Sequence, residues 1–184
     1  MPTEGHEAAL IESAMKGDAD AFAGLYDLHL AQVYRYVYYH LGNRVDAEDV
    51  TQQTFLQAWQ AIRKYRLGGS PFIAWLLAIA HNAAISLRRR SKGETHFELE
   101  PAAAHKWADP EGQALARYER LALRRAVLRL KPDQQQVVLL RFLEGLEYAD
   151  IAKALGKSEG NVRVIQHRAL GELRRLLASE VRER

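Results

Sequence analysis

Hydrogen-bonding side chains recur at helical spacing near the C-terminal end of this 184-residue chain. If the residues after Ser158 form a helix, about 100° of rotation per residue places Arg163, Val164 and His167 on one face, with Asn161 on its flank. An arginine side chain can hold a guanine edge with two hydrogen bonds, and the major groove of DNA admits one helix. These residues therefore predict a helix that reads DNA bases. The alternative is an ordinary basic helix face that contacts only water.

The apolar residues around this face predict a second helix in front of it. Ile151 and Leu155 lie four residues apart on one helix face, and Gly156 can take the left-handed backbone conformation that ends a helix. Ser158 is a suitable N-cap for the following helix. The apolar residues of that helix recur at helical spacing at Val162, Ile165, Ala169 and Leu173. Residues 146–173 therefore predict a helix-turn-helix, and this pattern favours DNA reading over a merely solvated face.

The composition sets the broad class of the chain. Hydrophobic residues make up 48% of it, enough for a sizeable core in one domain or two small ones. Apolar runs such as residues 73–80 are far shorter than the roughly 18 residues that cross a bilayer, and the N-terminus lacks a signal pattern. We therefore expect a cytoplasmic protein without membrane insertion. Because the chain has no cysteine, seven scattered histidines and no phosphate-loop spacing, we also expect no metal, no cofactor and no enzymatic activity.

Charge is unevenly distributed along the chain. Residues 1–91 carry 9 Lys and Arg against 9 Asp and Glu, residues 92–112 carry 2 against 5, and residues 113–184 carry 15 against 9. The middle segment lacks a helical period and contains two prolines and two glycines, which indicates a linker. We therefore predict an all-α fold with two small helical domains, 1–91 and 113–184, joined by a flexible linker at 92–112. The basic C-terminal domain suits phosphate contact.

A helix is strongly signalled from residue 46 onward. Asp46 is its predicted N-cap, and Val45 is predicted to face Val50 as a hydrophobic staple. Its predicted outer face is rich in short acids and amides, at Glu48, Asp49, Gln52, Gln53, Gln57 and Gln60. Such a face is either plain surface or a docking face for a basic protein partner.

Another helix is predicted over residues 70–90, beginning at a serine N-cap followed by proline. Phe72 and Trp75 belong to its apolar side, and three arginines at residues 88–90 suit the dipole at its C-terminal end. The functional interpretation is phosphate contact beside aromatic rings that stack on unpaired bases.

Two further helices are predicted before the helix-turn-helix. The first covers residues 113–130, with apolar residues toward a core and its arginines outside, at Arg117, Arg120, Arg124 and Arg125. Pro132 begins the second, which runs to Gly145. The C-terminal domain is therefore expected to contain four helices.

Four runs of sequence resemble those of one protein family, and they occur in the same order. They are DAEDVTQQTFLQAW at 46–59, SPFIAWLLAIAHNAAISLRRR at 70–90, LKPDQQQVVLLRFLEGLEYADIAKALG at 130–156 and GNVRVIQHRAL at 160–170. Over nearly its whole length the chain resembles a bacterial sigma factor of the extracytoplasmic-function (ECF) group of the sigma-70 family. The resemblance implies that the chain binds core RNA polymerase and directs it to promoters, and that an anti-sigma factor holds it until an environmental or envelope signal arrives.

The resemblance also implies roles for particular residues. The N-terminal domain, sigma region two, would dock on the polymerase clamp through Asp49, Gln52 and Gln53. It would open the minus-ten element, and the residues assigned to the melted strand are Phe72, Trp75, His81, Asn82, Arg88, Arg89 and Arg90. The C-terminal domain, sigma region four, would read the minus-thirty-five element through Ser158, Asn161, Arg163, Val164, Gln166, His167 and Arg168.

Three departures from the family pattern bear on these roles. Ala78 stands where many relatives carry arginine, and Glu147 replaces the usual Ser or Thr cap of the first motif helix, which predicts a weaker cap. Ile165 and Gln166 are reversed in character relative to many relatives. The competing hypothesis is a dimeric DNA-binding regulator that acts without polymerase. Only the sigma hypothesis accounts for a second helical domain with an acidic, amide-rich face and an aromatic-plus-arginine helix.

Overall fold

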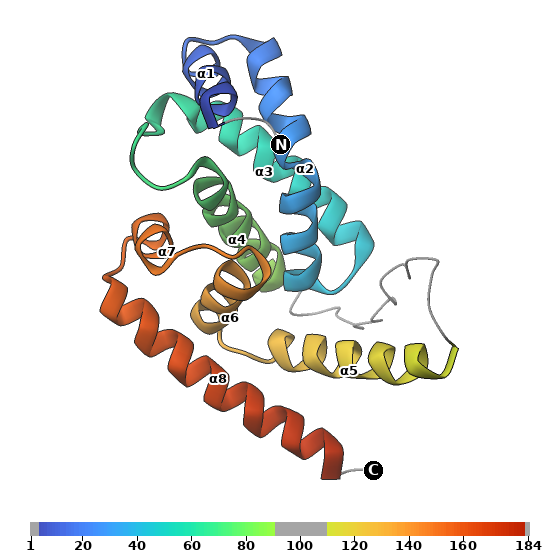
Figure 1. Ribbon diagram of the computed structural model, residues 1–184. Helices are drawn as coiled ribbons and strands as arrows, with labels where there is room; N and C mark the ends of the chain where they lie inside the picture. The colour runs from blue at the N-terminus through green and yellow to red at the C-terminus, as the bar shows by residue number, and fades with distance from the viewer. Residues whose placement is uncertain (1–3, 91–109, 183–184) are drawn as a thin grey trace.

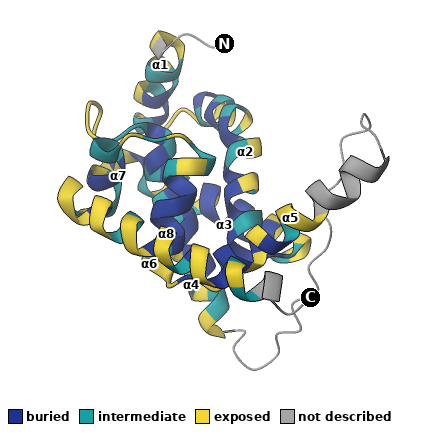
Figure 2. Cartoon of the chain, turned by 60° about the horizontal axis from the view of Figure 1, so that its bottom comes forward, coloured by how far each residue is buried: buried dark blue, intermediate teal, exposed yellow. Residues whose placement is uncertain are grey.

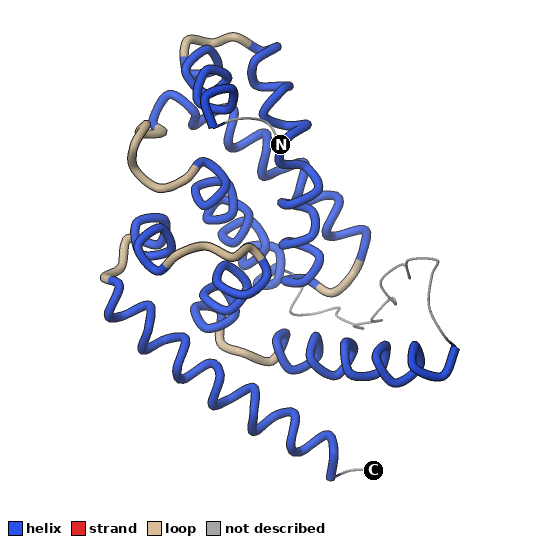
Figure 3. Tube along the Cα trace, viewed as in Figure 1, coloured by secondary structure: helices blue, strands red, loops and turns tan. Residues whose placement is uncertain are grey.

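The computed structural model describes residues 4–90 and 110–182. Within these two ranges all regular structure is helical, as Figure 1 and Figure 3 show. In chain order the elements are α1 (Glu4–Met15), α2 (Ala19–Leu41), α3 (Arg44–Ala61), the 3₁₀ turn η1 (Ile62–Lys64), α4 (Phe72–Arg90), α5 (Pro110–Leu128), α6 (Pro132–Val138), the π-helical turn η3 (Leu139–Leu143), α7 (Tyr148–Leu155) and α8 (Glu159–Arg182). The predicted all-α fold is confirmed.

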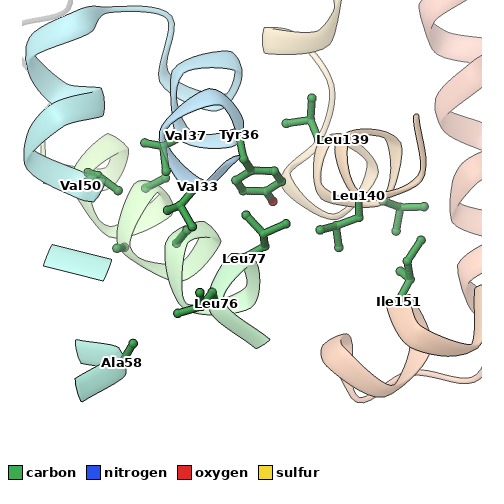
Figure 4. Close-up of a cluster of buried hydrophobic side chains, with 14 of the residues drawn as sticks. Val33, Tyr36, Val37, Val50, Ala58, Leu76, Leu77, Leu139, Leu140 and Ile151 are labelled. Carbon is green, nitrogen blue, oxygen red and sulfur yellow. The ribbon is translucent and has the colours of Figure 1, made fainter. Parts of the chain in front are cut away.

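Helices α1 to α4 pack together as the N-terminal unit. The Asp18 carboxylate caps α2 by accepting hydrogen bonds from the backbone N–H groups of Asp20 and Ala21, at 3.0 and 3.1 Å. Gly42 ends the same helix in the left-handed conformation, with φ 92°. Figure 4 shows the core that α2, α3 and α4 build, which includes Val33, Tyr36, Val37, Val50, Leu76 and Leu77. Because this core fixes the inner faces of α3 and α4, it also fixes which of their residues face outward.

The start of α3 corrects the sequence prediction. Asn43, not Asp46, is the N-cap: its Oδ1 accepts a hydrogen bond from the backbone N–H of Asp46 at 2.8 Å. Asn43 Nδ2 in turn donates to the Asp46 carboxylate at 2.6 Å, so Asp46 is the third residue of a reciprocal cap. The predicted staple is also wrong, because Val45 is 70% exposed.

Helices α5 to α8, with η3, form the C-terminal unit. Helix α5 begins at Pro110, inside the stretch predicted as linker, and residues 91–109 lie outside the described residues. Pro132 begins α6 as predicted, but the helix changes to a π-helical turn after Val138. In that turn the Glu144 N–H donates to the Leu139 carbonyl oxygen, five residues earlier, at 3.1 Å. The helix-turn-helix of α7 and α8 then follows, as predicted.

The two units pack against each other. In Figure 1, α7 lies beside α4 and α5 lies across the C-terminal end of α2. The Glu144 carboxylate, on a side chain with no exposed area, accepts hydrogen bonds from Gln32 at 2.7 Å and Arg35 at 2.8 Å. Gln135 Nε2 donates to the His40 carbonyl oxygen at 3.3 Å. Glu144 Oε2 and Gln135 of the C-terminal unit therefore find their partners on α2, whereas the buried Glu144 Oε1 has no hydrogen-bond partner among the described residues.

Arg124 on α5 corrects another prediction, because it lies in this contact and not on the outside. It is only 4% exposed, and its guanidinium donates to the Tyr38 hydroxyl at 3.0 Å and to the Gly42 carbonyl oxygen. The last carbonyl groups of a helix have no partner within the helix, so α2 offers an acceptor at its end. Helical periodicity within α5 carries no information about this acceptor.

Candidate nucleic-acid interface and docking face

The helix-turn-helix is built around the junction of α7 and α8. Gly156 ends α7 with φ 62°, and the Ser158 hydroxyl accepts a hydrogen bond from the Asn161 N–H at 3.2 Å, which confirms its predicted capping role. Of the predicted inward residues of α8, Val162, Ala169 and Leu173 are buried and Ile165 is half-buried. Glu147 makes no side-chain capping bond to α7, in agreement with its predicted weakness as a cap.

The outward face of α8 carries most of the side chains predicted to read DNA. Those that are exposed are Asn161, Arg163, Val164, His167 and Arg168, whereas Gln166 is half-buried. Figure 2 shows exposed residues recurring along α8 on the side away from the packed helices. The predicted rotation of this helix therefore places hydrogen-bonding groups where a groove of DNA could meet them.

One aromatic ring and two arginines form a cluster where α7 meets α8. The guanidinium carbon of Arg163 lies 3.9 Å from the centroid of the Tyr148 ring, and that of Arg141 lies 4.7 Å from it. Arg141 Nη1 also donates to the Leu146 carbonyl oxygen at 2.8 Å and to the Glu147 carboxylate at 3.0 Å. Sequence spacing did not single out Tyr148 or Arg141, because the three side chains come from three different elements.

Helix α4 places the residues predicted for the melted strand in two different environments. Phe72 is 3% exposed, and its ring packs 5.3 Å from Tyr65 and 5.4 Å from Trp75, centroid to centroid. His81 is 6% exposed, so in this arrangement neither Phe72 nor His81 is available to a nucleic acid. Trp75 and Arg88 are half-buried, and the exposed members of the set are Asn82, Arg89 and Arg90.

His81 packs against a second buried histidine at the contact between the units. The centroids of the His40 and His81 rings are 4.9 Å apart, and neither ring nitrogen of His40 has a hydrogen-bond partner among the described residues. Burial, with repulsion from His81 when it is protonated and from Arg88, holds the pKa of His40 well below its usual value. Burial also lowers the pKa of His81 to about 4; Asp133 opposes this shift and Arg88 reinforces it. Both imidazoles are therefore neutral at pH 7.

A cleft between α4, α6 and α8 joins the two predicted DNA-contacting sets. Asn82, Arg88 and Arg89 line it from α4, and Arg168 lines it from α8. Arg88 Nη1 donates to Gln135 Oε1 at 3.2 Å across the contact between the units. The structure thus brings the C-terminal half of α4 close to the recognition helix, which the sequence alone did not predict.

The outer face of α3 presents a continuous stripe at helical spacing. Asp49, Gln52 and Gln53, the residues predicted for docking, are exposed along it, and Gln60 extends it. Leu56 lies within the stripe and is 58% exposed. We call Asp49, Gln52, Gln53, Leu56 and Gln60 the α3 stripe. Only polar residues were assigned to the outer face from the sequence, so Leu56 was not predicted to belong to the stripe.

Among residues 4–90 and 110–182, no group of three histidine or acidic side chains is placed to hold a metal ion. None of the helices in the described ranges is both long and apolar enough to cross a membrane.

Comparison with known proteins identifies the family. Residues 25–94 match the family model described as Sigma-70 region 2, and residues 120–173 match the one described as Sigma-70, region 4. The chain is 41% identical over 177 residues to the ECF RNA polymerase sigma factor BldN of Streptomyces coelicolor. The matched region covers 94% of this chain and 66% of BldN. It is 31% identical over 170 residues to the ECF RNA polymerase sigma factor SigL of Mycobacterium tuberculosis. This matched region covers 90% of the chain and 94% of SigL.

Solved structures agree on the fold. The chain superposes with a TM-score of 0.71 and 24% identity on CnrH, solved in complex with the cytosolic domain of CnrY, over 95% of this chain and 98% of that one. RpoE of Bartonella quintana, solved with the anti-sigma factor NepR, gives a TM-score of 0.64 at 24% identity, over 85% and 96% of the two chains. The matches in sequence show that the chain belongs to the ECF group of sigma-70 family RNA polymerase sigma factors, a family of transcription regulators.

Proposed function

We propose that this chain is a promoter-specificity subunit, which binds core RNA polymerase and directs it to initiate transcription at a particular set of promoters. The observation that carries the proposal is the presence of two exposed faces of different chemistry, one on each unit. The outward face of α8 offers arginine, asparagine and histidine, whereas the α3 stripe offers one acid, three amides and a leucine. A DNA-binding regulator that acts alone has no use for the second face.

Each unit would make its own contact with the promoter. The C-terminal unit would place α8 in the major groove of the minus-thirty-five element, where Arg163 reaches base edges. The N-terminal unit would hold the melted minus-ten strand with the exposed side chains Asn82, Arg89 and Arg90, and with Trp75 as the ring nearest the surface. Unstacking a base costs a few kcal/mol, which contacts with polymerase help to offset.

The α3 stripe would supply the contact with polymerase. An exposed leucine among amides and an acid gives a partner both apolar area and hydrogen-bond sites, and the acid favours a basic partner surface. Because the stripe lies on a helix whose opposite face is buried, the backbone positions from which its side chains project are fixed. Docking through this stripe would also bring α4 to the DNA.

We also propose that the protein acts in the cytoplasm without catalysing a reaction of its own, and that an anti-sigma factor holds it until a signal releases it. The solved relatives support this partner, because their titles describe CnrH bound to the cytosolic domain of CnrY and RpoE bound to the anti-sigma factor NepR.

Transcription in vitro tests the proposal. Purified core polymerase would be incubated with a promoter library, with and without this chain, and the transcripts sequenced. We expect specific initiation only when the chain is added. If the chain instead binds a two-fold repeated DNA site tightly by itself and leaves the transcripts unchanged, it is a stand-alone regulator.

A further inference from the structure

Tyr148, the first residue of α7, lies beneath two arginine side chains that come from different elements. The guanidinium carbon of Arg163, on α8, is 3.9 Å from the centroid of the tyrosine ring, and that of Arg141, in the π-helical turn, is 4.7 Å from it. Two like charges near one ring repel each other, whereas the negative face of the ring attracts both. The ring therefore allows two cations to occupy one small region of the surface.

The two arginines differ in what else holds them. Arg141 is anchored by its hydrogen bonds to the Leu146 carbonyl oxygen and the Glu147 carboxylate, and its side chain is only 26% exposed. Arg163 has a 57% exposed side chain, and its ion pair with Glu159 is long, at 3.6 Å. The pose of Arg163 therefore depends mainly on its contact with the Tyr148 ring.

A fixed pose matters for a side chain that must make two hydrogen bonds at once. A free arginine loses much rotamer entropy when it binds, and a side chain ordered beforehand avoids that loss. The planar guanidinium must also meet the base edge at the correct angle. A ring that stacks on the guanidinium restrains both its position and its plane.

We propose that Tyr148 is a positioning residue for promoter reading. Its ring holds Arg163 in the pose that contacts a base edge of the minus-thirty-five element, beside the separately anchored Arg141, whose guanidinium can meet the adjacent DNA phosphate. This role rests on the proposed function, because it requires that the outward face of α8 reads DNA.

The test uses polymerase reconstituted with the full chain, and it compares transcription from a preferred promoter with transcription from promoters altered only in the minus-thirty-five element. The variants are Tyr148→Leu, Tyr148→Phe, Arg163→Ala and the double variant Tyr148→Leu/Arg163→Ala. Arg163→Ala is expected to lower discrimination about 5-fold or more. Tyr148→Leu should lower it about 2- to 5-fold, Tyr148→Phe should retain it, and Tyr148→Leu should add almost nothing when Arg163 is already absent. If Tyr148→Leu fails to fold by circular dichroism, Tyr148→Met, which fills the space without a ring, takes its place.

Three results would overturn the positioning role while leaving the proposed function intact. They are a folded Tyr148→Leu protein with unchanged discrimination, an equal loss for Tyr148→Phe, and a loss in the double variant that equals the sum of the two single losses. If Arg163→Ala itself leaves discrimination unchanged, the assignment of α8 as the reading helix is wrong, and the role of Tyr148 is overturned with it.

Discussion

The guanidinium carbon of Arg124 lies 4.1 Å from the centroid of the Tyr38 ring, which joins α5 of the C-terminal unit to α2 of the N-terminal unit. The same guanidinium donates to the Tyr38 hydroxyl and to the carbonyl oxygen of Gly42, at the end of α2. One arginine thus serves both as a stacking partner and as a helix cap across the contact between the units.

Arg124→Ala should therefore lower the stability of the folded chain. The substitution removes hydrogen bonds made by a charged donor and leaves the buried Gly42 carbonyl without this partner, at a cost of about 2 to 4 kcal/mol in the free energy of unfolding. Urea unfolding followed by circular dichroism measures the change. Arg125→Ala is the matched control, because the neighbouring arginine on α5 is exposed and should change the free energy by less than about 0.5 kcal/mol. Equal effects of the two substitutions would contradict this account.

The buried pair His40 and His81 predicts that acid weakens the fold. Both pKa values are lowered in the folded chain, that of His81 to about 4, whereas an unfolded histidine titrates near 6.5. Between these two values the unfolded chain binds more protons than the folded chain, so the free energy of unfolding falls as the pH is lowered from about 6.5 to 4. Each histidine contributes up to about 1.4 kcal/mol per pH unit within this window.

Urea unfolding at several pH values between 7.5 and 4.5 measures this slope. His40→Leu should make the free energy of unfolding depend less steeply on pH. The variant lacks one buried imidazole that takes up a proton when the chain unfolds. His6→Asn, at an exposed position on α1, should leave the slope as it is in the unaltered chain. A slope that His40→Leu does not change would show that other groups cause the loss of stability.

Promoter choice should depend on the outward face of α8. Arg163→Ala and His167→Ala are each expected to change the preferred minus-thirty-five sequence, because both side chains are exposed on that face. Loss of a bidentate contact between arginine and a base reduces discrimination by about 1 to 3 kcal/mol. A promoter-library assay measures the preference, and Arg174→Ala removes the same charge further along α8 as a control. An unchanged preference in both variants would mean that the assigned face of the helix is wrong.

Replacing Asp49, Gln52 and Gln53 with alanine should abolish association with core polymerase. The three side chains are exposed and alanine favours the helix, so the fold should persist. Pull-down with core polymerase and run-off transcription measure the effect, with helicity checked by circular dichroism. The control is Glu12→Ala/Asp27→Ala, which removes two exposed acids from α1 and α2. A folded triple variant that still binds polymerase and initiates normally would contradict docking through the α3 stripe.

Leu56→Ala tests the apolar part of the α3 stripe separately. The leucine is already 58% exposed in the free chain, so its loss should hardly affect folding. Where a partner covers it, removal of the side chain should weaken association with polymerase by about 1 to 2 kcal/mol. Titration of labelled core polymerase measures this difference, and unchanged affinity would exclude Leu56 from the docking face.

Local signals predicted most of the helices. Glycine and capping residues act within a few positions of the helix ends that they determine, as Gly156 and Ser158 show. The cap of α3 was misplaced by three residues because Asn43 and Asp46 are both good cap residues, and a reciprocal pair uses both of them.

Contacts between distant residues were harder to predict. Arg124 was expected outside because its partner, the end of α2, lies 82 positions earlier in the chain, where helical periodicity cannot indicate it. Phe72 is buried because Tyr65 and Trp75 pack around its ring. The exposed face of α8 was predicted correctly, since helical rotation alone decides it, whereas the contact of Arg163 with Tyr148 depends on how two helices cross.

In the π-helical turn Leu139–Leu143, the number of residues determines the position of Arg141 as much as the identity of the side chains does. Its hydrogen bond spans five residues instead of four, so the turn holds one residue more than an α-helix would need. Deleting that residue would restore ordinary winding and rotate the residues on one side of it by about 100° relative to those on the other. Arg141 would then leave Tyr148 even though every side chain of the cluster is still present. Variation within this family should therefore tolerate exchanges of side chains here far better than single-residue insertions or deletions.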